Sequence, residues 1–83
     1  MFGLNELFYS FVPFIIIAII ILQEEEARAL EAESVRTAEG GDLDQAHLII
    51  DRAINIAPNL ASLYNNRAQV STEAYYLSLI FSN

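Results

Sequence analysis

The sequence contains no cysteine and no lysine, and it has a single histidine. Without cysteine there is no disulfide framework, no thiolate metal site and no cysteine nucleophile. Four arginines stand against eleven acidic residues, giving a net charge of −7, which argues against nucleic acid or an anionic lipid surface as a partner. At 83 residues the chain has room for one small domain with a limited core.

Patterns that carry chemistry are also lacking. There is no glycine-rich phosphate loop, no metal-ligand cluster and no acid pair at catalytic spacing. His47 has no nucleophile or orienting acid at motif spacing, so it indicates a solvated histidine rather than a catalytic base. The run Glu24–Glu26 suits the first turn of a helix better than a Ca²⁺ site, because consecutive helical side chains point in different directions. We predict a protein that is not an enzyme and that uses no cofactor and no metal.

What the chain does have is a long apolar run near its N-terminus. Between Leu7 and Leu22 only Ser10 and Pro13 interrupt it. Residues 1–22 reach about 33 Å as a helix, and a hydrocarbon core is roughly 30 Å thick. Inside lipid, proline kinks such a helix rather than ending it. A core helix of a soluble bundle fits less well, because the run is apolar on every side and the rest of the chain is too short to cover it.

We therefore predict a single-pass membrane anchor over residues 1–22. Arg28 and Arg36 follow the run and no basic residue precedes it, so the positive-inside bias places the rest of the chain in the cytosol. Three alternatives stay open. The run could be a cleaved signal, although it lacks a basic n-region and a small-residue cleavage site. The chain could be cytoplasmic with the run outside lipid, or the run could be a non-native exon.

Three helical blocks follow the run. Residues 24–39 are rich in good helix formers, and Gly40 and Gly41 end the block. Asp42, with Gln45 three residues later, has the pattern of a helix N-cap. Pro58 ends the second helix, predicted over 43–57, and a third is expected to start near residue 60 or 61. The second helix carries one apolar face at helical spacing: Leu43, Ala46, Ile50, Ala53, Ile54 and Ala57.

The first and third blocks correspond at a fixed interval. Leu30 and Tyr64 are thirty-four positions apart, and so are Ser34 and Ala68. This period is typical of the tetratricopeptide repeat, in which small residues let helices approach closely and large ones fill the adjacent space. The sequence departs from the repeat pattern where Glu33 and Thr37 replace large residues. The residues predicted to pack the repeat are Leu30, Ser34, Ala46, Ile50, Ala53, Pro58, Tyr64 and Ala68.

The segment from Ala29 to Val70 resembles the opening of a small, three-repeat member of the tetratricopeptide repeat family, and the phrases LEAE, GDLD, RAINIAPN and YNNRAQ carry the resemblance. Together with the apolar run, this resemblance predicts an all-α fold: a hydrophobic single-pass helix in 1–22, one repeat hairpin in 23–59, and the first helix of a second, incomplete repeat with a divergent hydrophobic tail in 60–83. Because both ends depart from the family, we expect a truncated or alternatively spliced array, or a divergent relative.

The resemblance also implies a protein or peptide partner, with a DnaK-type heat-shock chaperone as the suggested one. Some arrays of the family grip an acidic C-terminal tail with a Lys and an Asn of the first repeat. Here Glu31 and Val35 occupy those two places, and Glu31 would repel such a tail. Because the first helices of repeats line the concave groove, the third helix is predicted to contact the partner through Asn65, Asn66 and Arg67.

A single repeat followed by one helix leaves an apolar seam uncovered, so we expect an unstable monomer that seeks a partner, a membrane or itself. The tail after residue 71 is expected either to fold back as a fourth helix or to lengthen the third. Two other functions stay open: a single-pass microprotein that regulates a membrane complex through residues 1–22, and a splice product without a selected function. The residues expected to be exposed are Leu48, Ile49, Ile56, Tyr75, Tyr76, Leu77, Leu79, Ile80 and Phe81.

Overall fold

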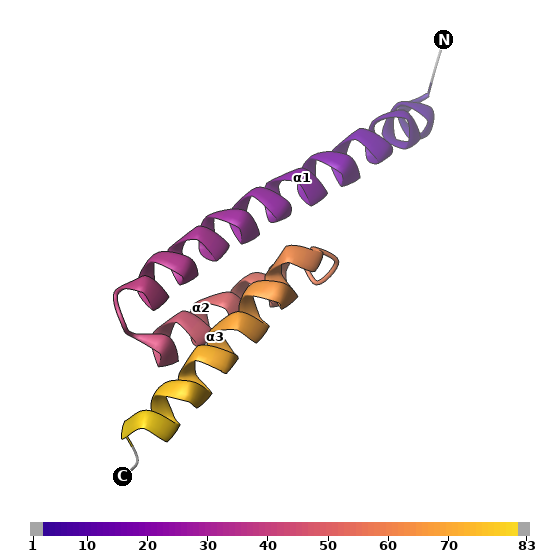
Figure 1. Cartoon of the computed structure of the whole chain (residues 1–83). Helices are drawn as coiled ribbons and strands as arrows, with labels where there is room; N and C mark the ends of the chain where they lie inside the picture. The colour runs from indigo at the N-terminus through magenta and orange to yellow at the C-terminus, as the bar shows by residue number, and fades with distance from the viewer. Residues whose placement is uncertain (1–2, 82–83) are drawn as a thin grey trace.

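In a computed structural model that describes residues 3–81, the chain forms three helices and no strand is present in that range. They are α1 (Leu4–Glu39), α2 (Leu43–Ile56) and α3 (Ala61–Phe81). Successive helices run in opposite directions and lie side by side, and α1 extends far beyond the other two (Figure 1). The predicted all-α class and the repeat hairpin are confirmed. Positions 1, 2, 82 and 83 of the predicted segments lie outside the described residues.

The apolar run and the acidic segment after it belong to one helix. α1 continues without a break from Leu4 to Glu39, and Pro13 lies inside it. The expectation that Glu24–Glu26 form the first turn of a new helix is wrong, since they lie in the middle of α1. Glutamate, alanine and arginine are good helix formers, so the composition changes here while the backbone conformation does not.

Two glycines turn the chain between α1 and α2. Gly41 has a φ of +95°, in the left-handed region. Its N–H donates to the Ala38 carbonyl at 2.9 Å, and the Asp42 N–H donates to the Thr37 carbonyl at 3.1 Å. These two bonds form the Schellman arrangement that closes a helix. The Asp42 carboxylate then accepts from the Gln45 N–H at 3.1 Å, so Asp42 is the N-cap of α2, as predicted.

Hydrogen bonds from both sides hold the second turn, between α2 and α3. The Ala57 N–H donates to the Ala53 carbonyl at 2.9 Å, and the Leu60 N–H donates to the Ala57 carbonyl at 3.2 Å. The Tyr64 hydroxyl reaches back from α3 and donates to the Pro58 carbonyl at 2.7 Å. α3 then begins at residue 61, within the predicted range.

The core lies on both sides of α2, which is the middle helix of the bundle. Ile49 was expected to be exposed, and this was wrong, because only 2% of it is accessible. A helix covered by two neighbours buries a wider stripe than one face of the repeat pattern suggests. One buried cluster consists of Ala27, Leu30, Ile49, Ile50, Ala53, Ala57 and Leu63, and a second consists of Leu43, Ala46 and Val70.

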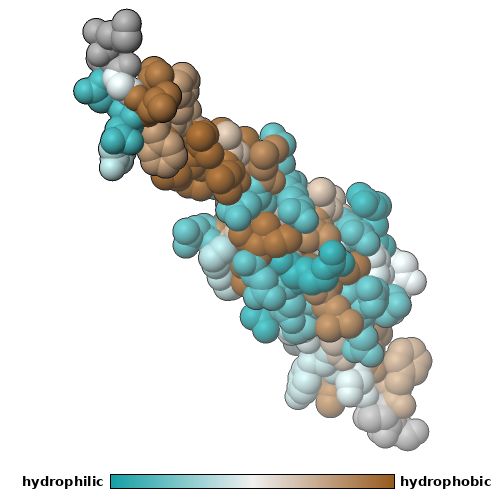
Figure 2. All heavy atoms as spheres, turned by 180° about the vertical axis from the view of Figure 1, so that it is seen from behind, coloured by the Kyte–Doolittle hydropathy of each residue, from teal (hydrophilic) through white to brown (hydrophobic). Residues whose placement is uncertain are grey.

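The molecule is a rod of 76 × 17 × 14 Å, with a radius of gyration of 19.0 Å. A compact chain of this length would have a radius of gyration of about 12 Å. The excess comes from the N-terminal half of α1, which projects from the bundle and shows hydrophobic side chains on its surface (Figure 2). By length and composition, α1 is the one helix in the described part of the chain that could cross a membrane.

The tail is a continuation of α3 rather than a fourth helix. Its large apolar side chains are exposed, at the opposite end of the molecule from the start of α1 (Figure 1). Within residues 3–81, no further helix covers the outer face of α3. The exposed apolar residues of this segment are Tyr75, Tyr76, Leu77, Leu79, Ile80 and Phe81.

Candidate functional site

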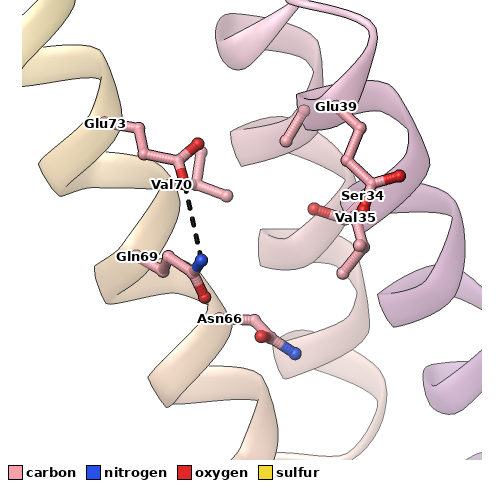
Figure 3. A pocket seen from close by; sticks show the side chains of 8 residues that line it. Ser34, Val35, Glu39, Asn66, Gln69, Val70 and Glu73 are labelled. Atoms are coloured by element: carbon pink, nitrogen blue, oxygen red, sulfur yellow. Dashed lines mark hydrogen bonds between the residues drawn. The ribbon is translucent and has the colours of Figure 1, made fainter.

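A solvent-open pocket of about 430 Å³ lies between α1 and α3, and we call it the α1–α3 groove. One wall comes from α1 and the other from α3, two helices whose residues correspond at an interval of thirty-four positions. α2 lies beneath both walls (Figure 3). The α3 wall uses residues at helical spacing, so they share one face. The groove is lined by Ser34, Val35, Ala38 and Glu39 from α1 and by Asn66, Gln69, Val70 and Glu73 from α3.

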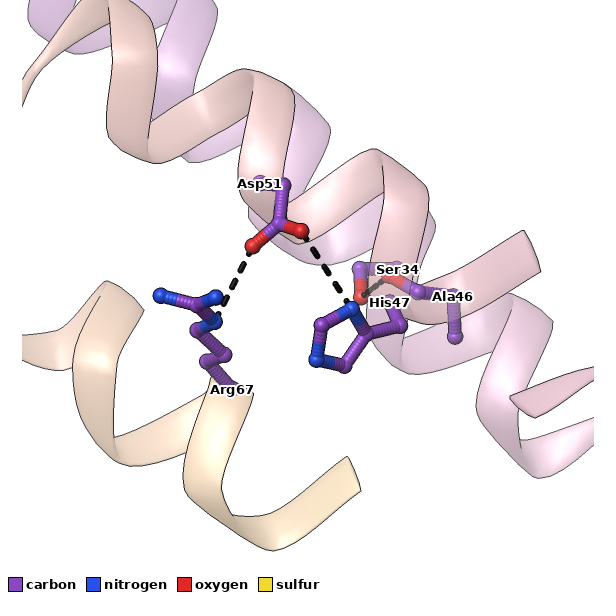
Figure 4. Close-up of polar contacts among 5 residues, drawn as sticks. All are labelled: Ser34, Ala46, His47, Asp51 and Arg67. Carbon is purple, nitrogen blue, oxygen red and sulfur yellow. Dashed lines mark hydrogen bonds and ion pairs between the residues drawn. The ribbon is translucent and has the colours of Figure 1, made fainter. Parts of the chain in front are cut away.

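The floor of the groove is closed by two buried residues. Ser34 is 1% accessible, and its hydroxyl donates to the Ala46 carbonyl at 2.7 Å (Figure 4). A small side chain here lets α1 approach α2 closely, and the hydrogen bond satisfies the buried hydroxyl. Val70 is 6% accessible and belongs to the same cluster as Ala46.

Carboxylates dominate the polar rim of the groove. The Asn66 side-chain amide donates to the Glu31 carboxylate at 2.7 Å, which ties α3 to α1. The Gln69 amide faces Glu73 along α3 at 3.4 Å (Figure 3). Glu39 lies on the opposite wall, and the lining includes no basic residue. The groove therefore carries negative charge, and both side-chain amides already donate to carboxylates.

The three predicted contact residues do not share a face. Asn66 lines the groove, whereas the guanidinium Nε of Arg67 lies 3.0 Å from an Asp51 oxygen on α2 (Figure 4). The other Asp51 oxygen is 3.3 Å from His47 Nδ1. Asn65 is exposed and is not part of the lining. Consecutive helical residues are about 100° apart, so three in a row cannot line one groove.

Sequence reasoning missed Gln69 and Glu73, although their positions could have been found. They follow Asn66 by three and seven residues, which is the spacing of one helix face. Stepping along the helix period from Asn66, which was predicted to contact the partner, would have identified the α3 wall. The same step from Val35, which occupies a contact place in related arrays, leads to Glu39 on the α1 wall.

The residues predicted to pack the repeat divide into two groups. Leu30 is 8% accessible, whereas its equivalent Tyr64 is 43% accessible. α2 covers the relevant face of α1, but no described helix covers the outer face of α3. A packing role for the exposed members of this set therefore stays a prediction. Leu30, Ser34, Ala46, Ile50 and Ala53 are buried, and Pro58, Tyr64 and Ala68 are exposed.

Between residues 3 and 81, no three side chains of the metal-ligating types gather closely enough to hold an ion. In the same range, every buried polar side-chain atom has a hydrogen-bond partner. The groove thus offers apolar contacts and carboxylate acceptors to a ligand.

A helix–turn–helix with a 34-residue correspondence between α1 and α3 has the architecture of a tetratricopeptide repeat. Among curated proteins, the chain is similar to tetratricopeptide repeat protein 36: it is 51% identical over 47 residues to the proteins of Mus musculus and Bos taurus, and 49% identical to that of Homo sapiens. These matches cover 57% of this chain and 25% of each relative, so the chain matches about a quarter of their length. No protein-family model and no solved structure matches the chain.

Proposed function

We propose that this chain is a protein-interaction module that binds a peptide segment of a partner in the α1–α3 groove, without catalysis. The observation that carries the proposal is the groove itself, whose two walls come from α1 and α3, with Val35 and Glu39 thirty-four positions before Gln69 and Glu73. The similarity to tetratricopeptide repeat proteins supports a protein-binding role at the level of the class.

The groove favours an apolar segment that carries basic residues. Ser34, Val35 and Val70 offer a surface for aliphatic side chains, while Glu39 and Glu73 would attract Arg or Lys. An acidic C-terminal tail would meet like charge from Glu39 and Glu73 and from Glu31 beside Asn66. If the partner is a DnaK-type chaperone, as the family resemblance implies, we propose that it binds through a basic segment and not through its acidic tail.

The test compares two fluorescent peptides that differ only in charge. One alternates Leu with Arg and the other alternates Leu with Glu, and anisotropy is measured on the full chain in phosphatidylcholine nanodiscs. We expect the Arg peptide to bind, with an affinity that falls as salt rises. Glu73→Gln should weaken binding about threefold, the size of one exposed ion pair. Glu33→Gln, on an exposed residue outside the groove, is the matched control. If neither peptide binds, the proposed function is wrong.

We also propose that α1 tethers the module to a membrane with the groove in the cytosol. The exposed apolar half of α1 supports the tether, and the basic residues after it, Arg28 and Arg36, support the orientation. Alkaline carbonate extraction of membranes from cells that express the tagged chain tests this. The chain should stay in the membrane pellet, and release into the supernatant would refute the tether.

A second candidate function places the activity in the apolar segment itself. The segment presents an almost continuous isoleucine surface from Ile15 to Ile21, all of it exposed, which a transmembrane partner could contact. Replacing residues 7–22 by an unrelated apolar helix separates the two functions. Peptide binding in the groove should survive the exchange, whereas regulation of a membrane complex should be lost.

A further inference from the structure

The α2–α3 turn lies against α1 at the point where the apolar run ends. A second solvent-open pocket of about 420 Å³ lies between α1 and this turn. The residues that line it show which part of α1 lies beside the turn. In Figure 1 this turn is the end of the α2–α3 hairpin that points toward the N-terminal half of α1. The pocket is lined by Ile20, Gln23 and Glu24 from α1 and by Ile56, Ala57, Pro58, Asn59 and Leu60 from the turn.

The length of α1 fixes where this turn would lie relative to a membrane. The helix from Leu4 to Gln23 is about 30 Å long, which matches the hydrocarbon core of a bilayer. Gln23 and Glu24 are the first polar residues after the run, so they would emerge at the headgroups. Because α1 is continuous there, no linker separates the membrane segment from the bundle. The turn at the same level would meet the headgroup layer.

The two turns of the hairpin, at opposite ends of α2, differ in charge in the way that this placement requires. Residues 56–60 carry no charge, and the half-buried side chains of Ile56 and Leu60 lie at the two ends of this range. Tyr64 packs its hydroxyl on this turn, and tyrosine is enriched at membrane interfaces. The opposite turn, between α1 and α2, exposes Asp42 and Asp44. An uncharged turn toward the bilayer and an acidic turn away from it agree with one orientation of the rod.

We propose that residues 56–60 rest in the headgroup layer of the membrane that α1 crosses, so that the module is attached at two points. This inference rests on the proposed membrane tether. The lipid committed to is zwitterionic, because the chain has a net charge of −7 and Glu24–Glu26 lie at the same level on α1. Attachment at two points would hold α1 close to the membrane normal and keep the α1–α3 groove at a fixed height above the surface.

The lack of cysteine in the chain allows single labels to be placed at will. Three variants, Ile16→Cys, Asp44→Cys and Asn59→Cys, are each labelled with the fluorophore NBD in the full chain and reconstituted into phosphatidylcholine nanodiscs. All three residues are exposed, and far-UV circular dichroism checks that each variant folds. One set of discs contains phosphatidylcholine with a nitroxide on the headgroup, and iodide serves as the quencher in water.

We expect the headgroup nitroxide to quench the label at position 59 at least twofold more strongly than the label at position 44, which lies roughly 20 Å further along α2. The label at position 16 should be protected from iodide. Equal quenching at positions 59 and 44, with position 16 still protected, would show that the α2–α3 turn does not lie in the headgroup layer. The proposed tether would be unaffected by that result. Iodide access at position 16 would overturn the tether and this inference together.

Discussion

At the scale of single residues, the repeat depends on side chains that are small enough to be covered. Ser34 lies where α1 crosses α2, and any larger side chain there would separate the two helices. Its hydroxyl is satisfied by the Ala46 carbonyl, so burial of this polar group carries little penalty. The position therefore accepts a small residue with or without a hydroxyl, but not a large one.

We predict that Ser34→Ala lowers the free energy of unfolding by about 1 kcal/mol, because it removes one buried hydrogen bond. Ser34→Leu should cost about 3 kcal/mol through overpacking. Urea unfolding of the full chain in detergent, followed by circular dichroism, measures both. Thr72→Ala is the control, since the Thr72 hydroxyl makes a similar 2.8 Å bond to the Ala68 carbonyl on the exposed surface. A cost for Thr72→Ala as large as that for Ser34→Ala would contradict the role of burial.

The two turn glycines give a matched pair of substitutions. Gly41 has a positive φ and open space around its Cα, so Gly41→Ala meets no clash and its effect is backbone strain of about 1 kcal/mol. Gly40 has an ordinary helical conformation, and a methyl group there makes normal contacts with the Arg36 and Thr37 carbonyls. Gly40→Ala should therefore be neutral or slightly stabilising. Thermal unfolding of the two variants compares them, and equal shifts would contradict the assignment of strain to Gly41.

At the scale of the element, α2 holds the bundle together. It is capped by Asp42 at its start, and it buries side chains against α1 on one side and α3 on the other. The exposed apolar residue of this helix is Leu48, which is 59% accessible. The contribution of each apolar residue to stability should therefore follow its burial rather than its type.

Ile50→Ala should lower the free energy of unfolding by about 3 kcal/mol, because it opens a cavity in a fully buried position. In a bundle this small, that loss should leave a large fraction of the hairpin unfolded at room temperature. Leu48→Ala, two residues away on the same helix, should change stability by less than about 0.5 kcal/mol. Hydrogen exchange of α2 amides detects the difference, and similar protection in the two variants would refute it.

The sequence was enough to locate α2 and both turns, because local chemistry determines them. Asp42, Gly41 and Pro58 act on the backbone within a few residues, so their effect can be read without the tertiary structure. The continuity of α1 across Glu24 could not be predicted this way, since a change from apolar to acidic residues marks a change of surroundings and not of conformation. The helix period alone places Gln69 on the same face as Asn66, but that this face lies opposite α1 across a groove depends on how the helices pack.

At the scale of the whole molecule, two apolar surfaces lie at opposite ends of a rod 76 Å long. One is the projecting half of α1, and the other is the last part of α3 from Tyr75 onward. A single bilayer perpendicular to α1 could not cover both, because the acidic hairpin lies between them. The two surfaces therefore need different environments, and only the first is long enough to cross a membrane.

Placing two arginines in the first surface should abolish its insertion. Ile16→Arg with Ile17→Arg adds about 3 kcal/mol per residue to the cost of transfer into the bilayer centre. We expect the double variant to move from the carbonate-resistant pellet to the supernatant. Tyr75→Arg with Tyr76→Arg adds the same charge to the second surface and should leave the chain in the pellet. Retention of the first variant in the pellet would mean that the projecting half of α1 is not the membrane segment.

Because α1 continues without a break through Glu24, its N-terminal half fixes the direction in which the α1–α3 groove opens. Each residue of an α-helix advances the chain by about 1.5 Å and turns it by about 100°. Removing one residue near position 24 would thus leave the height of the groove almost unchanged while rotating its opening by more than a quarter turn about the helix axis. Under the proposed tether, the number of residues between the bilayer and the hairpin therefore sets the direction from which a partner reaches the groove.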